Sequence, residues 1–396
     1  MKKNLLLLLL PILICNCSKP ENSAISKIDI RGHEVNILHY SELDGTNSIK
    51  LSDIATDFHF IPLETNKDCM IGYAYYHIYD KYIIVVNPYE KILLFNGKGE
   101  FLRKLCIAGK GPREFQNAVT TVDEENDVLY IGDESKSYFM SWDLTNGNYL
   151  GDIPRVYSGR LKNIIFTEDN TLICAPCVGN GEAGKYYIFE QDTKGDLIRE
   201  IKAPEQKGWA DSNDKLLYFS GSSYNYIPIN IDTIYRVYGS ELIPYWMFDF
   251  GRENEQLAGK PGGRSFDYEF ESDRFFVGNI FTISKVETNA TEGGSSTRTS
   301  HKVEHLTIDK KTNQIYLNDK LRNDFIGEKE SYLSLLKVLP NNSIYQAINA
   351  ISLIEHAEKV EADPDANLEV KLRLKKLLTQ IDIEDNPVLI VGELKK

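Results

Sequence analysis

A short stretch that begins with glycine and continues as a strand recurs three times at a fixed interval. The copies start at Gly99, Gly147 and Gly195, so each begins 48 residues after the one before. Each copy follows an aromatic-bearing run and a polar turn, an order typical of a β-hairpin. A strand-rich repeat of about 40–50 residues is typical of a β-propeller, in which each repeat forms one four-stranded blade. The interval therefore predicts an all-β propeller.

The composition agrees with this fold and argues against one class of partner. The chain of 396 residues contains 23 Tyr and 17 Phe, residue types that favour strands. Its formal net charge is −13, whereas binding to a phosphate backbone needs clustered Lys and Arg. We therefore expect a large β protein that does not bind nucleic acid.

The N-terminus has the pattern of an export signal. Lys2 and Lys3 precede an apolar run at 5–14, which is too short to cross about 30 Å of hydrocarbon as a helix and is typical of a signal peptide. The residues that follow resemble a bacterial lipoprotein signal, in which a cysteine becomes the first, acylated residue of the mature chain. We assign this role to Cys17, with Cys15 as one alternative and an ordinary secretory signal as the other.

The signal divides the chain into three predicted parts. Residues 1–16 are a lipoprotein signal peptide, residues 17–26 a lipidated tether, and residues 27–396 a single propeller domain. Two or more acyl chains anchor a protein stably to a membrane without crossing it. We therefore expect an exported protein that is anchored by its lipid to the outer membrane, with the periplasmic or surface side left open.

The strand pattern predicts how the ring closes. Five successive repeats are visible, and the fifth carries a low-complexity hairpin tip at 289–300. The chain ends supply a sixth sheet, from 343–349, 387–392 and the N-terminal 58–63. Sharing strands between both ends removes an exposed sheet edge. We predict six blades, with seven as the alternative.

A helical insertion interrupts the last blade. Apolar residues recur at helical spacing over about 350–382, near the C-terminus. Asp363 followed by Pro364 is typical of a helix start. The fold prediction is therefore a six-bladed β-propeller with a short helical insertion.

Five segments resemble the six-bladed β-propeller lipoproteins of Bacteroidetes, which are distantly similar to NHL-repeat propellers. In chain order they are 51–54, 61–65, 109–115, 232–237 and 384–389. The resemblance covers most of the chain from Ser52 onward and departs at Arg113, where that family usually has a glycine. It implies the fold, export and lipidation, and it assigns no catalytic residue.

Two local patterns resemble chemical sites. Cys174 and Cys177 have the spacing of a redox pair, but the first leaves a strand and no helix follows to lower its pKa. Free thiols or a local disulfide are the alternatives. His301 and His305 would share a metal on a helix, whereas on a strand they lie about 13 Å apart. We therefore predict no metal site and no cofactor.

The loops at the faces of the ring are the remaining candidates for function. They carry side chains suited to stacking and hydrogen bonding against a sugar or a peptide, namely Arg113, Tyr224, Tyr226, Arg264 and Tyr268. The alternative is that these aromatic side chains pack between blades.

Two functions remain open at this stage. The first is a non-enzymatic binding or scaffold protein for a glycan, a peptide or a protein partner. The alternative is a hydrolase or lyase with a metal-assisted site at the central channel. Converging metal ligands at the channel would favour the second.

Overall fold

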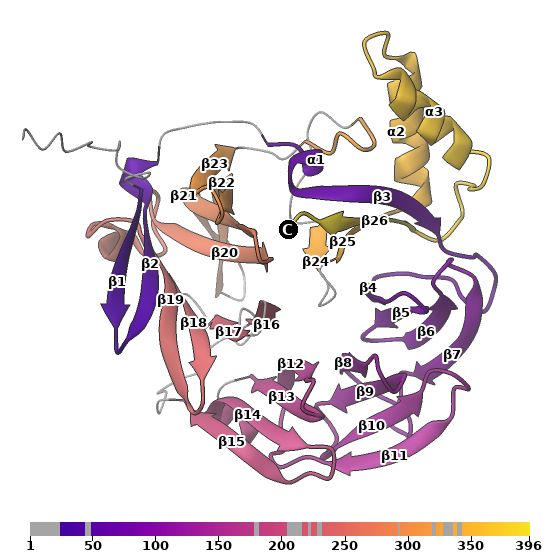
Figure 1. Ribbon diagram of the computed structural model, residues 1–396, viewed down its shortest axis with the longest axis horizontal. Coiled ribbons are helices and arrows are strands. Elements are labelled where there is room, and N and C mark those ends of the chain that lie inside the picture. Colours follow the sequence, from indigo (N-terminus) through magenta and orange to yellow (C-terminus); the bar gives the residue numbers. More distant parts are fainter. Residues whose placement is uncertain are drawn as a thin grey trace, which may run out of the picture.

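The computed structural model describes residues 24–43, 49–177, 182–203, 216–220, 223–227, 232–291, 294–318, 322–327, 336–338 and 343–396. The predicted signal peptide, the acylated cysteine and the predicted tether up to residue 23 lie outside these ranges. Residues 24–26 of the predicted tether are described, and Ile25 and Ser26 already belong to the first strand. Within them the strands form six sheets arranged around a common centre, as Figure 1 shows. The fold is therefore all-β and propeller-like, as the repeat predicts.

Three successive sheets, I to III, repeat one four-stranded unit. Sheet I contains β4 (Tyr75–Ile78), β5 (Tyr82–Asn87), β6 (Lys91–Asn96) and β7 (Phe101–Ile107). Sheet II contains β8 (Ala118–Asp123), β9 (Val128–Asp133), β10 (Tyr138–Asp143) and β11 (Tyr149–Pro154). Sheet III contains β12 (Leu161–Phe166), β13 (Thr171–Pro176), β14 (Tyr186–Asp192) and β15 (Leu197–Lys202). In each sheet the first strand lies nearest the centre (Figure 1).

The glycines that define the repeat occupy the turn between the third and fourth strands of these sheets. Gly99, Gly147 and Gly195 all have positive φ, at 86°, 78° and 95°. Residues with a Cβ adopt this left-handed conformation only at an energetic cost, so glycine is the favoured residue there. The 48-residue interval thus records one turn repeated in three sheets.

Sheet IV is extended by the N-terminal segment. Its core strands are β16 (Leu216–Ser220), β17 (Ser223–Ile227), β18 (Thr233–Tyr238) and β19 (Glu241–Asp249). The hairpin of β1 (Ile25–Ile30) and β2 (His33–His39) adds two strands, because β2 pairs in parallel with β19. Sheet IV therefore has six strands where its neighbours have four.

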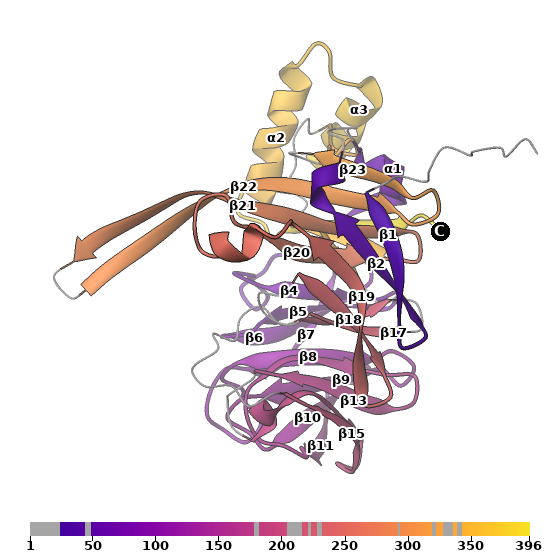
Figure 2. The same ribbon diagram turned by 90° about the vertical axis from the view of Figure 1, so that its left-hand side faces the viewer.

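Sheets V and VI carry the two large insertions. Sheet V contains β20 (Arg264–Glu271), β21 (Phe275–Thr291), β22 (Gly294–Asp309) and β23 (Gln314–Asn318). Sheet VI contains β24 (Leu336–Val338), β25 (Ser343–Ile348), β26 (Val388–Leu394) and the N-terminal β3 (Ala55–Pro62), which pairs antiparallel with β26. Beyond the rest of sheet V, β21 and β22 continue as a two-stranded arm that projects from the ring (Figure 2).

The helices lie at two places outside the sheets. The short α1 (Leu51–Ile54) precedes β3, and α2 (Ala350–Ala362) and α3 (Leu368–Leu377) form a hairpin between β25 and β26. The prediction that Asp363 starts a helix is wrong, because Asp363 caps the end of α2 and the Asn367 side chain accepts a hydrogen bond from Glu369 N at the start of α3. Three 3-10 turns complete the described elements, at Tyr40–Glu42, Ala183–Lys185 and Asn254–Leu257.

Neighbouring sheets pack through apolar side chains. Between sheets I and II, Ile84, Ile92 and Leu94 are fully buried against Ile131 and Met140. Each such side chain contributes about 1.5–3 kcal/mol when it leaves water. Burial of the same kind recurs around the ring, so packing between sheets is the main source of stability.

A buried carboxylate joins sheets IV and V. The Glu271 side chain has no exposed surface, and its Oε1 accepts hydrogen bonds from Tyr245 Oη and Lys310 Nζ, both at 2.7 Å. Its Oε2 accepts from Tyr218 Oη and Asn225 Nδ2, both at 3.3 Å. These donors, three of them on sheet IV, compensate the cost of removing the charge from water.

Candidate functional site

Two kinds of connection emerge on one face of the ring. Because the strands of each sheet are antiparallel, the connection from one sheet to the next lies on the same side as the connection between the second and third strands. We call this side the loop face. The arm and the α2–α3 hairpin are both connections of the second kind, in sheets V and VI, so both insertions start from the loop face. The arm then projects to the left in Figure 2, whereas the hairpin rises from the edge of the ring.

The loop at 109–115 joins sheet I to sheet II on this face. Its backbone closes on itself, because Gly111 N donates to Glu114 Oε2 at 2.7 Å and Gly109 N donates to Phe115 O at 2.8 Å. A Cβ on Gly109 would lie 2.0 Å from Glu114 Oε2, so a larger residue there would have to displace the Glu114 side chain. Phe115 is fully buried. The loop is therefore a fixed platform.

Arg113 is the exposed side chain of that platform. Its guanidinium carbon lies 4.7 Å from the centroid of the Tyr149 ring on β11, a cation–π distance. The residue is outside the left-handed region, so an arginine replaces the glycine of the resembling family without backbone strain. Arg113 is accessible, and whether it binds a ligand stays a prediction.

Arg264 starts β20 on the loop face. Its guanidinium carbon lies 4.5 Å from the centroid of the Tyr40 ring, and Tyr40 Oη donates to Glu304 Oε2 at 2.8 Å. Burial, followed by the hydrogen bond to Glu304, raises the pKa of Tyr40. Arg264 is thus engaged by the 3-10 turn that follows β2.

The three candidate tyrosines pack between strands. Tyr226 is fully buried, with its ring 5.4 Å from that of Tyr187, and burial raises its pKa. Tyr268 stacks on Tyr218 at 4.0 Å, and burial raises its pKa as well. Tyr224 is half-buried near the start of β17, toward the face opposite the loop face. The packing alternative therefore describes Tyr226 and Tyr268, and the structure does not bring the five candidates together.

The centre of the ring holds a histidine in a neutral environment. His77 on the innermost strand β4 shares a hydrogen bond of 2.7 Å between its Nε2 and Thr120 Oγ1 on β8. Burial lowers the pKa of His77 to about 4. The imidazole of His77 is therefore uncharged at neutral pH, and its hydrogen bond links sheets I and II.

The cysteines and the paired histidines take structural positions. Cys69, Cys106, Cys174 and Cys177 are buried free thiols, and burial raises the pKa of Cys106 to about 12 and that of Cys174 above its usual range. Cys106 and Cys174 therefore stay protonated and unreactive at neutral pH. His305 is buried on β22 beside Asn279, as the strand interpretation predicts. Over the described ranges, no group of three or more His, Cys, Asp or Glu side chains is placed to hold a metal ion.

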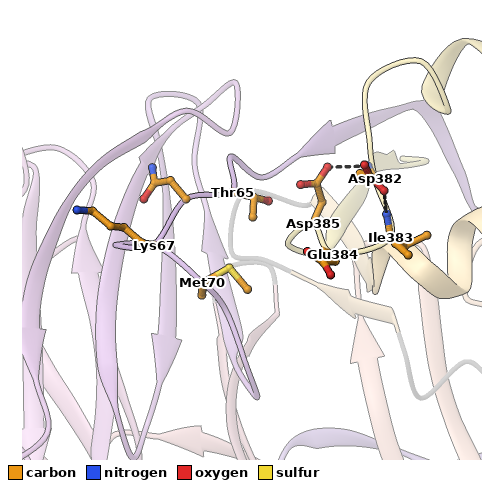
Figure 3. Close-up of a pocket in the computed structure, with 8 residues that line it drawn as sticks. Thr65, Lys67, Met70, Asp382, Ile383, Glu384 and Asp385 are labelled. Atoms are coloured by element: carbon orange, nitrogen blue, oxygen red, sulfur yellow. Dashed lines mark hydrogen bonds between the residues drawn. The ribbon is translucent and has the colours of Figure 1, made fainter.

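A cavity of about 590 Å³ opens where the two chain ends meet. One wall comes from 65–70, after β3, and the other from 382–385, between α3 and β26. Figure 3 shows Lys67 and Met70 on the first wall and Ile383, Glu384 and Asp385 on the second, with the side chains of Lys67 and Ile383 directed away from each other. Both walls are loop-face connections, and we call this place the seam pocket.

Asn386 fixes the two walls of the seam pocket to each other. Its Nδ2 donates to Glu64 O at 2.6 Å and to Cys69 O at 3.0 Å, and its Oδ1 accepts from Ile71 N at 2.8 Å. Its own backbone N donates to Thr65 Oγ1 at 2.8 Å. Because Asn386 is buried, these bonds are protected from water and the pocket is preformed.

Carboxylates dominate the charge of the seam pocket. Asp382 and Asp385 are tied to the backbone, since Asp385 Oδ2 accepts from Asp382 N and Asp382 Oδ1 accepts from Ile383 N, both at 2.7 Å. With Glu384, the wall carries three acidic side chains against Lys67 on the other wall. The pocket therefore has a net negative charge.

Sequence reasoning did not find the seam pocket. Its walls lie in two segments that resemble family motifs, 61–65 and 384–389, and Asn386 bonds Glu64 across 322 residues of chain. The sequence did contain one indication of the pocket, because the segments 61–65 and 384–389 both flank strands of the predicted sixth sheet. The structure adds that they meet and enclose a cavity.

The fold and the loop face define the class as an all-β, propeller-like protein. Residues 34–393 match the family described as "Domain of unknown function (DUF4934)", so the chain belongs to that family. Comparison with curated proteins gives no match.

Solved structures support the fold. A protein of Bacteroides fragilis named as a "putative exported protein" is similar at 17% identity and a TM-score of 0.64, covering 91% of this chain and 100% of that chain. A member of the DUF4221 family from Bacteroides vulgatus covers 87% and 98% at 10% identity, and the WD40 repeats of RRP9 cover 88% and 99% at 10% identity. Both have a TM-score of 0.44, so the fold argument rests on the first protein.

One observation bears directly on whether the chain crosses a membrane. Within the described ranges, no helix has the length and apolar character needed to cross a bilayer. The similar Bacteroides fragilis protein is named as exported. Lipid attachment at Cys17 stays a prediction, because that residue lies outside the described ranges.

Proposed function

We propose that this protein is an exported, lipid-anchored, six-bladed β-propeller that binds a glycan, a peptide or a protein partner through its loop face without chemical turnover. The lipid is on Cys17, with Cys15 as the alternative, and holds the protein at the outer membrane. Six sheets around one centre and the pairing of β3 with β26 support the blade count and the closure of the ring.

One observation carries the proposal. The arm, the α2–α3 hairpin and the seam pocket are all built from connections of the loop face. Connections of a rigid scaffold are where binding residues concentrate, since they vary without disturbing the packed sheets. In contrast, the turns on the opposite face of sheets I to III are short, and the glycine repeat shapes them. The loop face is therefore the face specialised for recognition.

Site-specific photocross-linking tests which face binds. A benzophenone amino acid replaces either Tyr73 on the loop face, which is 75% exposed, or Leu197 on the opposite face, which is 44% exposed. The full chain is expressed in a Bacteroides host, irradiated in cells and extracted in mild detergent. We expect one discrete adduct from the Tyr73 position and none from the Leu197 position.

Fractionation tests the anchor in the same cells. Cys17→Ser should move the protein from the membrane to the soluble fraction, whereas Cys15→Ser should leave it on the membrane. Adducts of equal yield from both cross-linking positions would contradict recognition by the loop face. A membrane-bound Cys17→Ser variant would contradict the assigned anchor.

A further inference from the structure

The exposed apolar side chains of the loop face are not spread evenly around the ring. Among the described residues, its exposed large apolar side chains come from sheets I and VI and the connections between them. They include Tyr73 at 75%, Leu372 at 60%, Ile383 at 56% and Met70 at 47%. The exposed apolar side chains of sheets II and III, such as Leu150 and Leu197, lie at the opposite turns. Two of these exposed side chains, Met70 and Ile383, line the seam pocket.

The seam pocket is aliphatic and acidic. Among the described residues that line it, Met70 and Ile383 are the apolar ones and none is aromatic. Sugar rings usually stack on planar aromatic side chains, whereas a flexible thioether adapts to apolar side chains of different shapes. The carboxylates of Asp382, Glu384 and Asp385 lie on the same wall as Ile383, across the pocket from Met70. The complementary ligand therefore carries apolar side chains beside positive charges.

The pocket also has the rigidity that a binding site needs. Asn386 ties both walls together through buried hydrogen bonds. A preformed site avoids the entropy cost of ordering its walls when a ligand binds. An extended or helical peptide segment fits an open cavity of about 590 Å³ better than a globular surface does.

We propose that the seam pocket binds a peptide segment of a partner protein in which bulky aliphatic side chains alternate with lysine or arginine. This inference rests on the proposed function and deepens it, because it names the site and the chemistry of the partner. The apolar side chains enter between Met70 and Ile383, and the basic ones pair with the carboxylates of 382–385.

The test is a fluorescence anisotropy titration of the purified chain from residue 18 onward, which keeps the whole of β1. The probe is a labelled 12-residue peptide of alternating leucine and lysine, and a peptide with glutamate in place of lysine is its control. We expect saturable binding of the lysine peptide alone. Ile383→Ser should weaken binding about 10-fold by removing apolar contact, and Glu384→Lys at least as much by reversing a charge.

Two matched variants separate the site from general effects of charge and hydrophobicity. Leu150→Ser removes an equally exposed apolar side chain, 54% against 56% for Ile383, and Glu125→Lys reverses an exposed charge on the opposite face. Both should bind within about 2-fold of the unmodified chain. Circular dichroism checks that all four variants are folded.

Several outcomes would overturn the inference. They are the absence of saturable binding, equal weakening by Leu150→Ser and Ile383→Ser, and equal weakening by Glu125→Lys and Glu384→Lys. Displacement of the peptide by the neutral oligosaccharide cellohexaose would assign the pocket to a glycan instead. None of these results affects the cross-link at Tyr73, so failure of this inference is distinguishable from failure of the proposed function.

Discussion

Sheets I to III and sheets IV to VI are built from the same four-stranded unit, but only the second group adds to it. Sheet IV gains the β1–β2 hairpin, sheet V the arm, and sheet VI the α2–α3 hairpin. The additions to sheets V and VI lie in the connection between the second and third strands, which is outside the packing between sheets. The ring therefore tolerates elaboration at that connection.

The two groups also differ in what joins neighbouring sheets. Sheets I and II meet through apolar side chains and the neutral His77. Sheets IV and V add the buried charge of Glu271 with its four donors. An apolar junction loses a fraction of its energy when one side chain is trimmed, whereas a buried ionic junction fails when one partner is removed.

The largest effect should come from Glu271→Ala. The substitution leaves Lys310 and three polar groups without their acceptor in a buried site, which costs about 3–5 kcal/mol of the free energy of unfolding. Urea denaturation followed by tryptophan fluorescence measures this loss. The control Glu241→Ala removes an exposed ion pair with Arg31 and should change stability by less than about 1 kcal/mol. A loss as small for Glu271→Ala as for the control would show that the junction does not depend on its charge.

The regular half should respond to pH through His77. Its pKa of about 4 in the folded state lies below the unfolded value of 6.5, so protons bind preferentially to the unfolded chain between these values. The free energy of unfolding that depends on the neutral His77 imidazole is therefore fully present above about pH 6.5. It is lost as the pH falls toward 4, by at most about 3 kcal/mol. We expect the His77→Gln variant to show a smaller difference in unfolding free energy between pH 8 and pH 4 than the unmodified protein. An unchanged difference would place the acid-sensitive group elsewhere.

The smallest effect should come from shortening the arm. Residues 285–291 and 294–300 pair only with each other in the described sheet, and their described side chains are exposed or half-buried. Replacing 285–300 by a two-residue Asn-Gly turn should change the midpoint of thermal unfolding by no more than about 2 °C. The contrasting deletion is the α2–α3 hairpin, where Leu353, Leu374 and Leu377 are buried against β26. Deletion of the α2–α3 hairpin should lower the midpoint of thermal unfolding strongly. Equal effects of the two deletions would contradict the view that the hairpin packs on the sheet and the arm does not.

The repeat explains why much of the ring could be predicted from the sequence. The segments predicted for the closing sheet, 343–349, 387–392 and 58–63, correspond to β25 (Ser343–Ile348), β26 (Val388–Leu394) and β3 (Ala55–Pro62). The pairing of β2 with β19 could not be predicted, because it joins Asn36 to Tyr245 across 209 residues. Strand alternation also does not tell which side chain faces a neighbouring sheet, and for this reason Tyr226 was expected at a face and lies in the core.

The site was predicted less well than the fold, for a physical reason. Arg113 is a loop residue whose polarity predicts its exposure, whereas Arg264 is half-buried at the start of β20 against Tyr40. The seam pocket depends on two segments from opposite ends of the chain and on the hydrogen bonds of Asn386 between them. A local pattern contains no information about such a distant meeting.

The shared sheet VI has a consequence for the order of folding. β3 is near the beginning of the chain and β26 is at its end, so their pairing has to overcome the loop entropy of nearly the whole polypeptide. Contacts of such long range form late and slow the folding reaction. Until the last residues are available, the edge of β3 has no partner in sheet VI. A nascent or truncated chain is therefore an open ribbon of sheets, and a chaperone that covers that edge would protect it from aggregation.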